Sequence, residues 1–446
     1  MHTTRSPIFR CARLAVLSLI VVGGCHRQAE QTVTVKFLQD GWVPTDDLPA
    51  VKAATEEFAH QTGIELELIR GVPAETVDQL TLIRTLMEKH AGGPDVVEVD
   101  EAWLGTLKDD LVDLRPFFPN DAVSISPALA SSYIIGGSVL AIPYLNQIGV
   151  LRYRADLLRR YGYDHPPGTW AELEAMALRI QTSERARGNK DFWGYIWPGA
   201  AEESLTCNAL EWQVDEGGGR LIEKDGAISV NNLAAIHAWQ RAKHWMGWIS
   251  PPAVAEYREG DARSAYESGR SAFVRVWSAE AGVLATRERP ELQAFNWSKP
   301  PVVGEDGFAA MPAGSVARVA VLGGSGVAIS KHSQHPHEDA TLIRFVLRKE
   351  LDSFQNRSPS LRPVIYDAAA VQGSISSSSN AVRLRATVVA RPTDVSAQHY
   401  EQVSRAYSGA VHSVLTGKKN AADAASELEQ SLVTITGQHT GPPGRE

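Results

Sequence analysis

The sequence predicts an α/β protein made of two lobes joined by crossing strands, and three observations support that prediction. The chain has 446 residues, more than one ordinary hydrophobic core requires. Residues 33–99 alternate between strand and helix patterns, which is typical of a mostly parallel sheet. The stretch 138–154 then carries two extended apolar runs, and another α/β pattern begins after it. We therefore expect 138–154 to leave one lobe and enter the other.

The first lobe is predicted to contain three strands separated by two helices. Strands are expected at 33–38, 64–69 and 95–99. Helices are expected at 48–60 and 75–90, where apolar residues recur at helical spacing. Because such strands run parallel, their carboxyl ends share one rim of the sheet, and ligands bind beyond that rim.

Acidic and aromatic residues follow two of these strands. Asp40 and Trp42 come after the first strand, and Asp100 and Trp103 come after the third. Both pairs are therefore expected at the same rim. Asp100 and Glu101 would suit paired acid and base carboxylates, but neighbours on an extended segment point to opposite sides. One of the two is expected to face a cleft and the other to be solvated.

Polar and aromatic residues also mark the crossing stretch. Pro143 has no N–H to donate to a central ladder, so the first apolar run is expected to end there or to follow a sheet edge. Tyr144, Asn146 and Gln147 come next. They are expected at the mouth of an interlobe cleft, where ligand pockets commonly occur.

The second lobe is predicted from a further series of helices and strands. A capping box at 169–172 opens one helix, and apolar spacing marks another at 233–248. Residues 319–330 carry strand patterns on either side of Gly323-Gly324-Ser325-Gly326, and we interpret them as the return crossing. The remaining elements are strands at 193–197 and 272–277 and helices at 208–214, 262–268, 339–347, 397–415 and 421–432.

The N-terminus has the features of a targeting segment. Three arginines precede an apolar run at 14–22 that is too short to span a bilayer. Val22-Gly23-Gly24-Cys25 resembles a bacterial lipobox, in which signal removal leaves the cysteine as a lipid-modified N-terminus. The alternative is an ordinary signal peptide with an incidental cysteine.

These features together predict where each part of the chain begins and ends. Residues 288–312 and 373–380 are expected to be loops because they are rich in proline or serine. The predicted parts are a signal peptide at 1–24, a tether at 25–31, an N-terminal lobe of 32–144 and 323–362, a C-terminal lobe of 145–322 and 363–437, and a disordered tail at 438–446.

Charge and cysteine content exclude several classes of function. The formal net charge is −8 and no basic stripe is present, which argues against a nucleic-acid partner. Of the three cysteines, Cys11 lies in the signal segment and Cys25 in the lipobox. Only Cys207 remains, and we expect it to be buried, so the exported body has neither a disulfide nor a thiolate zinc site.

The histidine-rich and glycine-rich motifs do not predict a metal, cofactor or catalytic site. Residues 332–337 contain three histidines but not the spacing of metal ligands, so no metal is predicted. Residues 323–326 lack the features of a phosphate loop or a nucleophile elbow, so no cofactor or catalytic residue is predicted either. Most of the eleven tryptophans are expected in the core, whereas Trp42 and Trp277, at strand ends, are expected to contact a ligand.

The order of short motifs resembles the extracellular solute-binding proteins, family 1, of ABC importers that take up sugars, and most of all their trehalose/maltose-type branch. The resemblance implies a periplasmic-binding-protein-like fold with an interlobe ligand cleft that closes by hinge motion. The motifs are, in order, Pro94–Val97, Ala141–Tyr144, Tyr153–Leu158, Thr169–Leu173, Leu205–Asn208 with Glu211-Trp212, Gly269–Phe273 with Arg275 and Trp277, Val321–Gly324, Pro363 with Tyr366, and Leu415–Lys418.

The resemblance also implies a set of sugar-binding residues. Carboxylates would accept hydroxyl hydrogens, arginine would donate as a rigid fork, aromatic rings would cover the sugar face and glycines would let the backbone approach. Gln147 stands where the family commonly has aspartate, and Ser325 where it has a bulky aromatic residue. The implied site residues are Asp40, Trp42, Asp100, Tyr144, Gln147, Glu203, Trp277, Gly323, Gly324 and Arg391.

The resulting hypothesis is a receptor that captures a sugar, closes and delivers it to a permease–ATPase complex without catalysing a reaction. The receptor would be a monomer anchored by lipid on the periplasmic or extracellular face of a bacterial membrane. Two alternatives stay open. One is a surface glycosidase with two carboxylates about 5 to 9.5 Å apart. The other is a sugar sensor or capture protein that is not coupled to transport.

Overall fold

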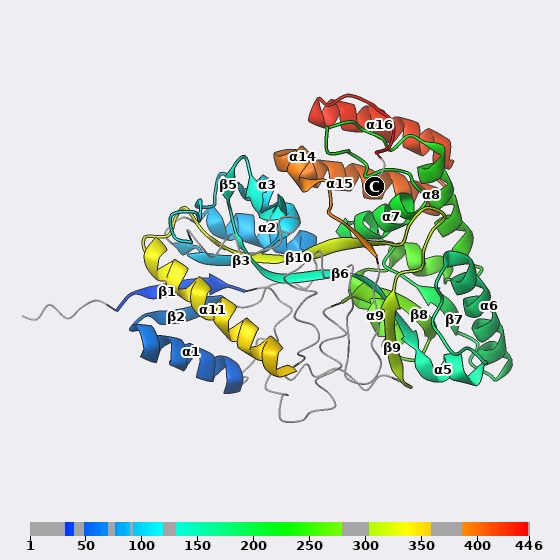
Figure 1. The fold of residues 1–446 in the computed structure, drawn as a ribbon, viewed down its shortest axis with the longest axis horizontal. Helices are drawn as coiled ribbons and strands as arrows, with labels where there is room; N and C mark the ends of the chain where they lie inside the picture. The colour runs from blue at the N-terminus through cyan, green and yellow to red at the C-terminus, as the bar shows by residue number, and fades with distance from the viewer. Residues whose placement is uncertain are drawn as a thin grey trace, which may run out of the picture. The chain divides into compact units, whose positions relative to one another are not determined.

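One mixed sheet runs through the described part of the chain (Figure 1), with nine strands in the order β2-β1-β3-β10-β6-β8-β7, β11 beside β10 and β9 beside β6. The structure is a computed structural model, and the fold is that of the unit 33–446. The residues it describes are 32–39, 49–69, 76–89, 92–118, 131–278, 303–357 and 386–444. The predicted signal peptide, the tether and Cys25 lie outside these residues.

The N-terminal strands and helices follow the predicted alternation. Strand β1 pairs in parallel with both β2 and β3, as expected. Apolar side chains of α1 and α11 pack on one face of this part of the sheet, and those of α2 and α3 on the other. The elements are β1 (Thr34–Leu38), α1 (Pro49–Thr62), β2 (Glu65–Ile69), α2 (Thr76–Met87), β3 (Val96–Asp100), α3 (Leu104–Leu107) and α11 (Pro336–Arg357).

The crossing stretch differs from the prediction because it is one continuous strand, β6 (Ile142–Arg154), rather than two runs. Its first half pairs with β10, and its second half pairs with β8 and β9. Leu145 lies opposite Ser325 whereas Pro143 lies opposite Gly326, so Tyr144 is the extra residue of a β-bulge. A proline is tolerated at a bulge, and the strand therefore continues through it.

The return crossing is also a single strand, β10 (Val319–Ile329). It pairs with β6 along its middle, with β3 at its C-terminal end and with β11 (Thr387–Val389) at its N-terminal end. Gly324 has a φ of 140°, a conformation that side-chain-bearing residues rarely adopt. The glycines expected to interrupt the strand therefore lie within it, and two adjacent strands join the lobes.

The C-terminal part of the sheet is covered by helices with a tryptophan-rich core. Trp170, Trp197, Trp212, Trp239 and Trp245 are all buried in one apolar cluster, which confirms their expected structural role. Strand β9 lies within a stretch predicted as loop and forms by pairing with β6. The elements are α5 (Ala155–Arg160), α6 (Trp170–Ala186), β7 (Trp193–Ile196), α7 (Glu203–Asp215), α8 (Leu233–Trp245), α9 (Glu259–Glu267), β8 (Ser271–Trp277) and β9 (Asp306–Ala310).

The chain closes with α14 (Thr393–Ser396), α15 (Tyr400–Leu415) and α16 (Ala421–Thr436). The prediction of a disordered tail is wrong for residues 438–444. Ile228 N donates to His439 O, and Gly441 N donates to Ile228 O, so this segment supplies the backbone partners of a buried residue. Among the described helices, none combines the length and the apolar character needed to cross a membrane.

Candidate functional site

The expected ligand-binding residues are described to different extents. Asp40 and Trp42 lie outside the described residues, and only the backbone of Tyr144 is described, at the bulge of β6. Gln147 pairs with Gly323 across the two crossing strands. The remaining side chains form two groups, one around Arg391 and one around Trp277.

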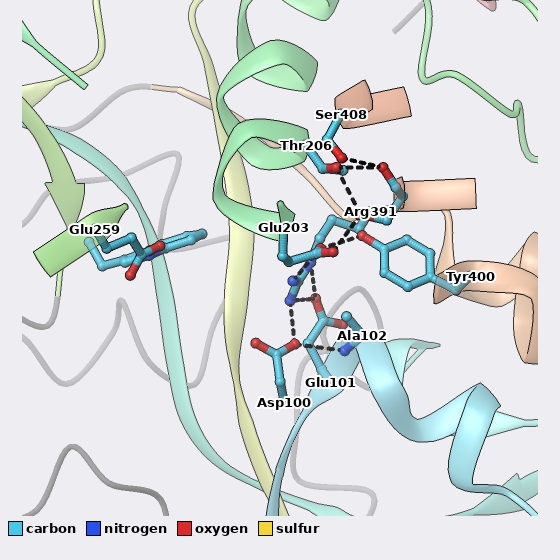
Figure 2. Close-up of polar contacts among 11 residues, drawn as sticks. Asp100, Glu101, Ala102, Glu203, Thr206, Glu259, Arg391, Tyr400 and Ser408 are labelled. Carbon is cyan, nitrogen blue, oxygen red and sulfur yellow. Dashed lines mark hydrogen bonds and ion pairs between the residues drawn. The ribbon is translucent and has the colours of Figure 1, made fainter. Parts of the chain in front are cut away.

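Arg391 lies at the centre of the first group, which we call the Arg391 cluster (Figure 2): Asp100, Glu101, Glu203, Arg391 and Tyr400. Arg391 Nη2 donates to Asp100 Oδ1 at 2.7 Å and to Glu101 Oε1 at 2.9 Å. Its Nη1 donates to Glu203 Oε1 at 2.9 Å, and its Nε donates to Glu101 Oε1 at 3.3 Å. Residues nearly 300 positions apart in the sequence are thus held together by one guanidinium.

Asp100 and Glu101 are placed by the end of β3. The strand ends at Asp100, and its Oδ1 accepts the N–H of Ala102 at 2.8 Å, which begins the short 3-10 turn Glu101–Trp103. Because the chain turns there, both carboxylates reach the same arginine. The expectation that one of them would be solvated is wrong, since 20% of the Asp100 side chain is exposed and only 1% of the Glu101 side chain.

Glu203 is placed by the first turn of α7. This helix begins five residues earlier than predicted, so the carboxylate lies at a helix N-terminus, where negative charge is stabilised. Besides Arg391, it accepts hydrogen bonds from Tyr400 Oη and Ser404 Oγ, both at 2.5 Å. Its two oxygens are therefore engaged by protein groups.

The Arg391 cluster has an excess of negative charge, with three carboxylates around one guanidinium. Burial raises the pKa of Asp100 and of Glu101, and the Arg391 charge opposes that rise. Burial disfavours the charged guanidinium too, but the Asp100 and Glu101 charges outweigh it and hold the pKa of Arg391 well above its ordinary value. The arginine therefore stays charged, and its charge favours the ionised form of Asp100 and of Glu101.

Trp277, at the end of β8, is the centre of the second group. Its Nε1 donates to Glu259 Oε1 at 2.8 Å, and 9% of the residue is exposed. The guanidinium carbon of Arg275 lies 3.9 Å from the ring centroid. Arg275 is in turn held by Glu211 through two hydrogen bonds, from Nη2 at 2.9 Å and from Nε at 3.3 Å. A buried ion pair thus supports one face of the ring.

Gly323 is required for this arrangement, because a Cβ there would lie 2.8 Å from Cη2 of the Trp277 ring. We therefore expect Gly323→Ala to displace the ring, to change its fluorescence and to lower the free energy of unfolding by about 1–3 kcal/mol. Gly409→Ala is the control, since a Cβ at 409 has no atom within 4 Å. Equal fluorescence and stability for wild type and Gly323→Ala would contradict the packing role of this glycine.

Other expected features take structural roles. Trp103, expected at the rim, is buried in the core beside Tyr400. Ser325, which replaces a bulky aromatic residue, donates to Glu98 Oε1 at 2.5 Å and is 5% exposed. Cys207 is buried, as predicted. Within the described ranges, no group of three or more His, Cys, Asp or Glu side chains is placed to hold a metal ion.

The sequence interpretation missed Tyr400, Ser404 and Glu259 and misassigned Glu101. Tyr400 and Ser404 are one helical turn apart near the start of α15, so their shared face was the available signal. Nothing in the local pattern links that face to Glu203, because 197 residues separate Glu203 from Tyr400 and 201 separate it from Ser404.

Comparisons with known proteins agree with this architecture. The family model described as bacterial extracellular solute-binding protein matches residues 41–351. A probable ABC transporter-binding protein of Deinococcus radiodurans is 35% identical over 429 residues, which cover 95% of this chain and 98% of the relative.

Two solved structures have a similar fold. The maltose-bound MalE3 of T. maritima is 26% identical, with a TM-score of 0.73, and the match covers 91% of this chain and 100% of that one. A solute-binding protein of Thermotoga lettingae with bound α-D-tagatose is 19% identical, with the same TM-score and coverage. The fold is therefore that of periplasmic binding proteins, and the chain belongs to the bacterial extracellular solute-binding protein family.

Proposed function

We propose that this protein is the substrate-binding component of an ABC importer for a sugar, and that it delivers the bound sugar to the permease. The observation that carries the proposal is the Arg391 cluster, in which Asp100 and Glu203, both expected to contact a sugar, meet at one arginine. The name of the Deinococcus relative supports the ABC assignment, and the maltose bound to the T. maritima protein supports a saccharide. Maltose or trehalose is the proposed class of ligand.

The proposed ligand site combines polar and aromatic groups. Carboxylates accept hydroxyl hydrogens strongly, and an aromatic ring excludes water from the apolar face of a sugar. A ligand that touches both lobes binds the closed form better and so shifts the population toward closure. The proposed site includes all the residues implied by the resemblance, either as ligand contacts or as residues that position a contact. Among them are Asp40, Trp42, Tyr144 and Gln147, with Gly323 and Gly324 at the crossing.

Family membership bears on the glycosidase alternative but not on the sensor alternative. The family consists of extracellular binding proteins that are not enzymes, so the chain is an exported binding protein and the glycosidase alternative is not retained. A sensor that is not coupled to transport stays the second candidate. The lipid anchor at Cys25, the lobe boundaries and the monomeric state are part of the proposal.

A thermal-shift panel tests the proposal directly. At least one of maltose, trehalose, glucose and tagatose is expected to raise the melting temperature of the exported body, because a ligand at 100 times its Kd adds about 2.7 kcal/mol to the free energy of unfolding. Asp100→Ala is expected to abolish the shift, and Asp109→Ala, at a side chain that is 85% exposed, is expected to keep it. The proposal fails if no sugar stabilises the wild type.

A further inference from the structure

The carboxylates of the Arg391 cluster differ in how much of each is available to a ligand. The exposed fraction of the side chain is 20% for Asp100, 8% for Glu203 and 1% for Glu101. Glu203 Oε1 already accepts from Arg391 and Tyr400, and its Oε2 accepts from Ser404. Only Oε2 of Glu203 retains capacity to accept another hydrogen bond, and just 8% of this side chain is exposed.

Asp100 has one oxygen fixed by the protein and one that is not. Within the described residues, both hydrogen bonds to its carboxylate go to Oδ1, from Arg391 Nη2 at 2.7 Å and from Ala102 N at 2.8 Å. Two donors on one oxygen set the plane of the carboxylate and leave Oδ2 as the acceptor. A group fixed in advance loses little conformational entropy when it binds a ligand.

Arg391 has little donor capacity left for a ligand. Of its N–H groups, those on Nε and Nη2 and one on Nη1 donate to Asp100, Glu101 and Glu203, so the described part of the chain leaves a single Nη1 hydrogen without an acceptor. The residue is 2% exposed. This differs from the role implied by the resemblance, in which arginine donates to the sugar as a fork.

We infer that Asp100 is the one carboxylate of the Arg391 cluster that contacts the sugar, and that Glu101, Glu203 and Arg391 are positioning residues that fix it. The inference rests on the proposed function, because it concerns the same site. It assigns to Arg391 the task of keeping Asp100 oriented and ionised. Glu101 and Glu203 in turn hold the guanidinium from two sides.

Because charged groups surround Asp100, the pH dependence of sugar affinity tests this assignment. Burial raises the pKa of Asp100, Arg391 lowers it and Glu203 raises it. Without Arg391, the pKa of Asp100 would rise further, and its carboxylate would ionise only at higher pH. The charged and titratable groups around Asp100 and its partners Arg391 and Glu203 are Glu98 on β3, Glu101 in the following turn, Tyr133, Cys207 on α7, and Tyr400 on α15.

Calorimetry with maltose at acidic, neutral and alkaline pH tests the inference. Asp100→Asn should weaken maltose binding by more than about tenfold at every pH. Arg391→Gln should weaken binding at neutral pH and recover affinity as the pH rises, because Asp100 then ionises without its cation. Glu203→Gln should cost less than tenfold and should move the acidic limb of the profile to lower pH, because a neighbouring negative charge is removed.

The control is Glu267→Gln, which alters another buried carboxylate paired with an arginine, Arg152 at 3.2 Å, and should leave maltose affinity unchanged. A loss in Arg391→Gln that is equal at every pH would overturn the inference, because a direct donor is lost at any pH. A loss of maltose affinity in Glu203→Gln as large as that in Asp100→Asn would overturn the inference as well. This second comparison remains possible even if Arg391→Gln does not fold. If the wild type binds none of the panel sugars, the proposed function itself fails, and the wild-type measurement identifies that failure.

Discussion

Glu211→Ala is expected to lower the free energy of unfolding by about 3–5 kcal/mol, because it leaves the Arg275 charge without its partner in the protein interior. Both side chains are 1% exposed. The same carboxylate accepts the N–H of Val321 at 3.1 Å, so the variant also leaves a buried backbone donor of β10 unpaired. Gly149 lies directly against the pair, since a Cβ there would meet both Glu211 Oε1 and Arg275 Nη2.

Urea denaturation followed by circular dichroism measures the effect of Glu211→Ala. The control is Glu427→Ala, which breaks the ion pair of Lys419 and Glu427 on the surface, where the side chains are 44% and 57% exposed. Exposed pairs contribute about 0–1 kcal/mol, so the control should unfold almost like the wild type. Similar midpoints for the two variants would show that the buried pair contributes no more than a surface pair.

Trp277→Ala is expected to weaken sugar binding by more than about tenfold, or 1.4 kcal/mol, and to lower the free energy of unfolding by about 3–5 kcal/mol. The affinity falls because the aromatic surface proposed for the sugar is removed. The stability falls because the ring packs against Gly323 and lies over the Arg275 guanidinium, while its Nε1 hydrogen bonds to Glu259.

A second tryptophan separates these two effects of Trp277→Ala. Trp193 on β7 also lies against an arginine, with the guanidinium carbon of Arg185 4.3 Å from its ring centroid, but it is not part of the expected site. Trp193→Ala should therefore lose stability and keep its affinity for the sugar, which calorimetry below the melting temperature measures. Equal affinities for Trp277→Ala and the wild type would remove Trp277 from the ligand site.

Local patterns predicted the parts of the fold that depend on neighbouring residues. The parallel strands β1 to β3 and the helices between them follow from hydrophobic periodicity, and this periodicity placed Asp100 at the end of β3. The same reasoning failed for Glu101, because it assumed an extended chain where the structure has a 3-10 turn. Strand β9 was missed because its residues, DGFAA, pair with β6 without a strand pattern of their own.

Local sequence patterns did not predict the contacts between residues that are far apart in the sequence. Arg391 was identified through the family resemblance alone, and its three carboxylate partners lie 188 to 291 residues away in the sequence. Pro143 was interpreted as a strand break because the sequence alone does not show the β-bulge that accommodates it. The glycines of β10 were interpreted in the same way because the sequence does not show the strand pairing that includes them. The sequence therefore could not predict that the charged residues of the Arg391 cluster contact one another.

The paired crossing strands affect how such a molecule changes shape. Because β6 and β10 are hydrogen-bonded to each other where they join the lobes, the proposed opening and closing would twist a two-stranded ribbon rather than unfold a linker. The bulge at Tyr144 and the positive φ of Gly324 lie at the middle of that ribbon, where we expect it to bend. Such a motion would keep the backbone hydrogen bonds between the two strands, so the proposed capture and release would require no local unfolding.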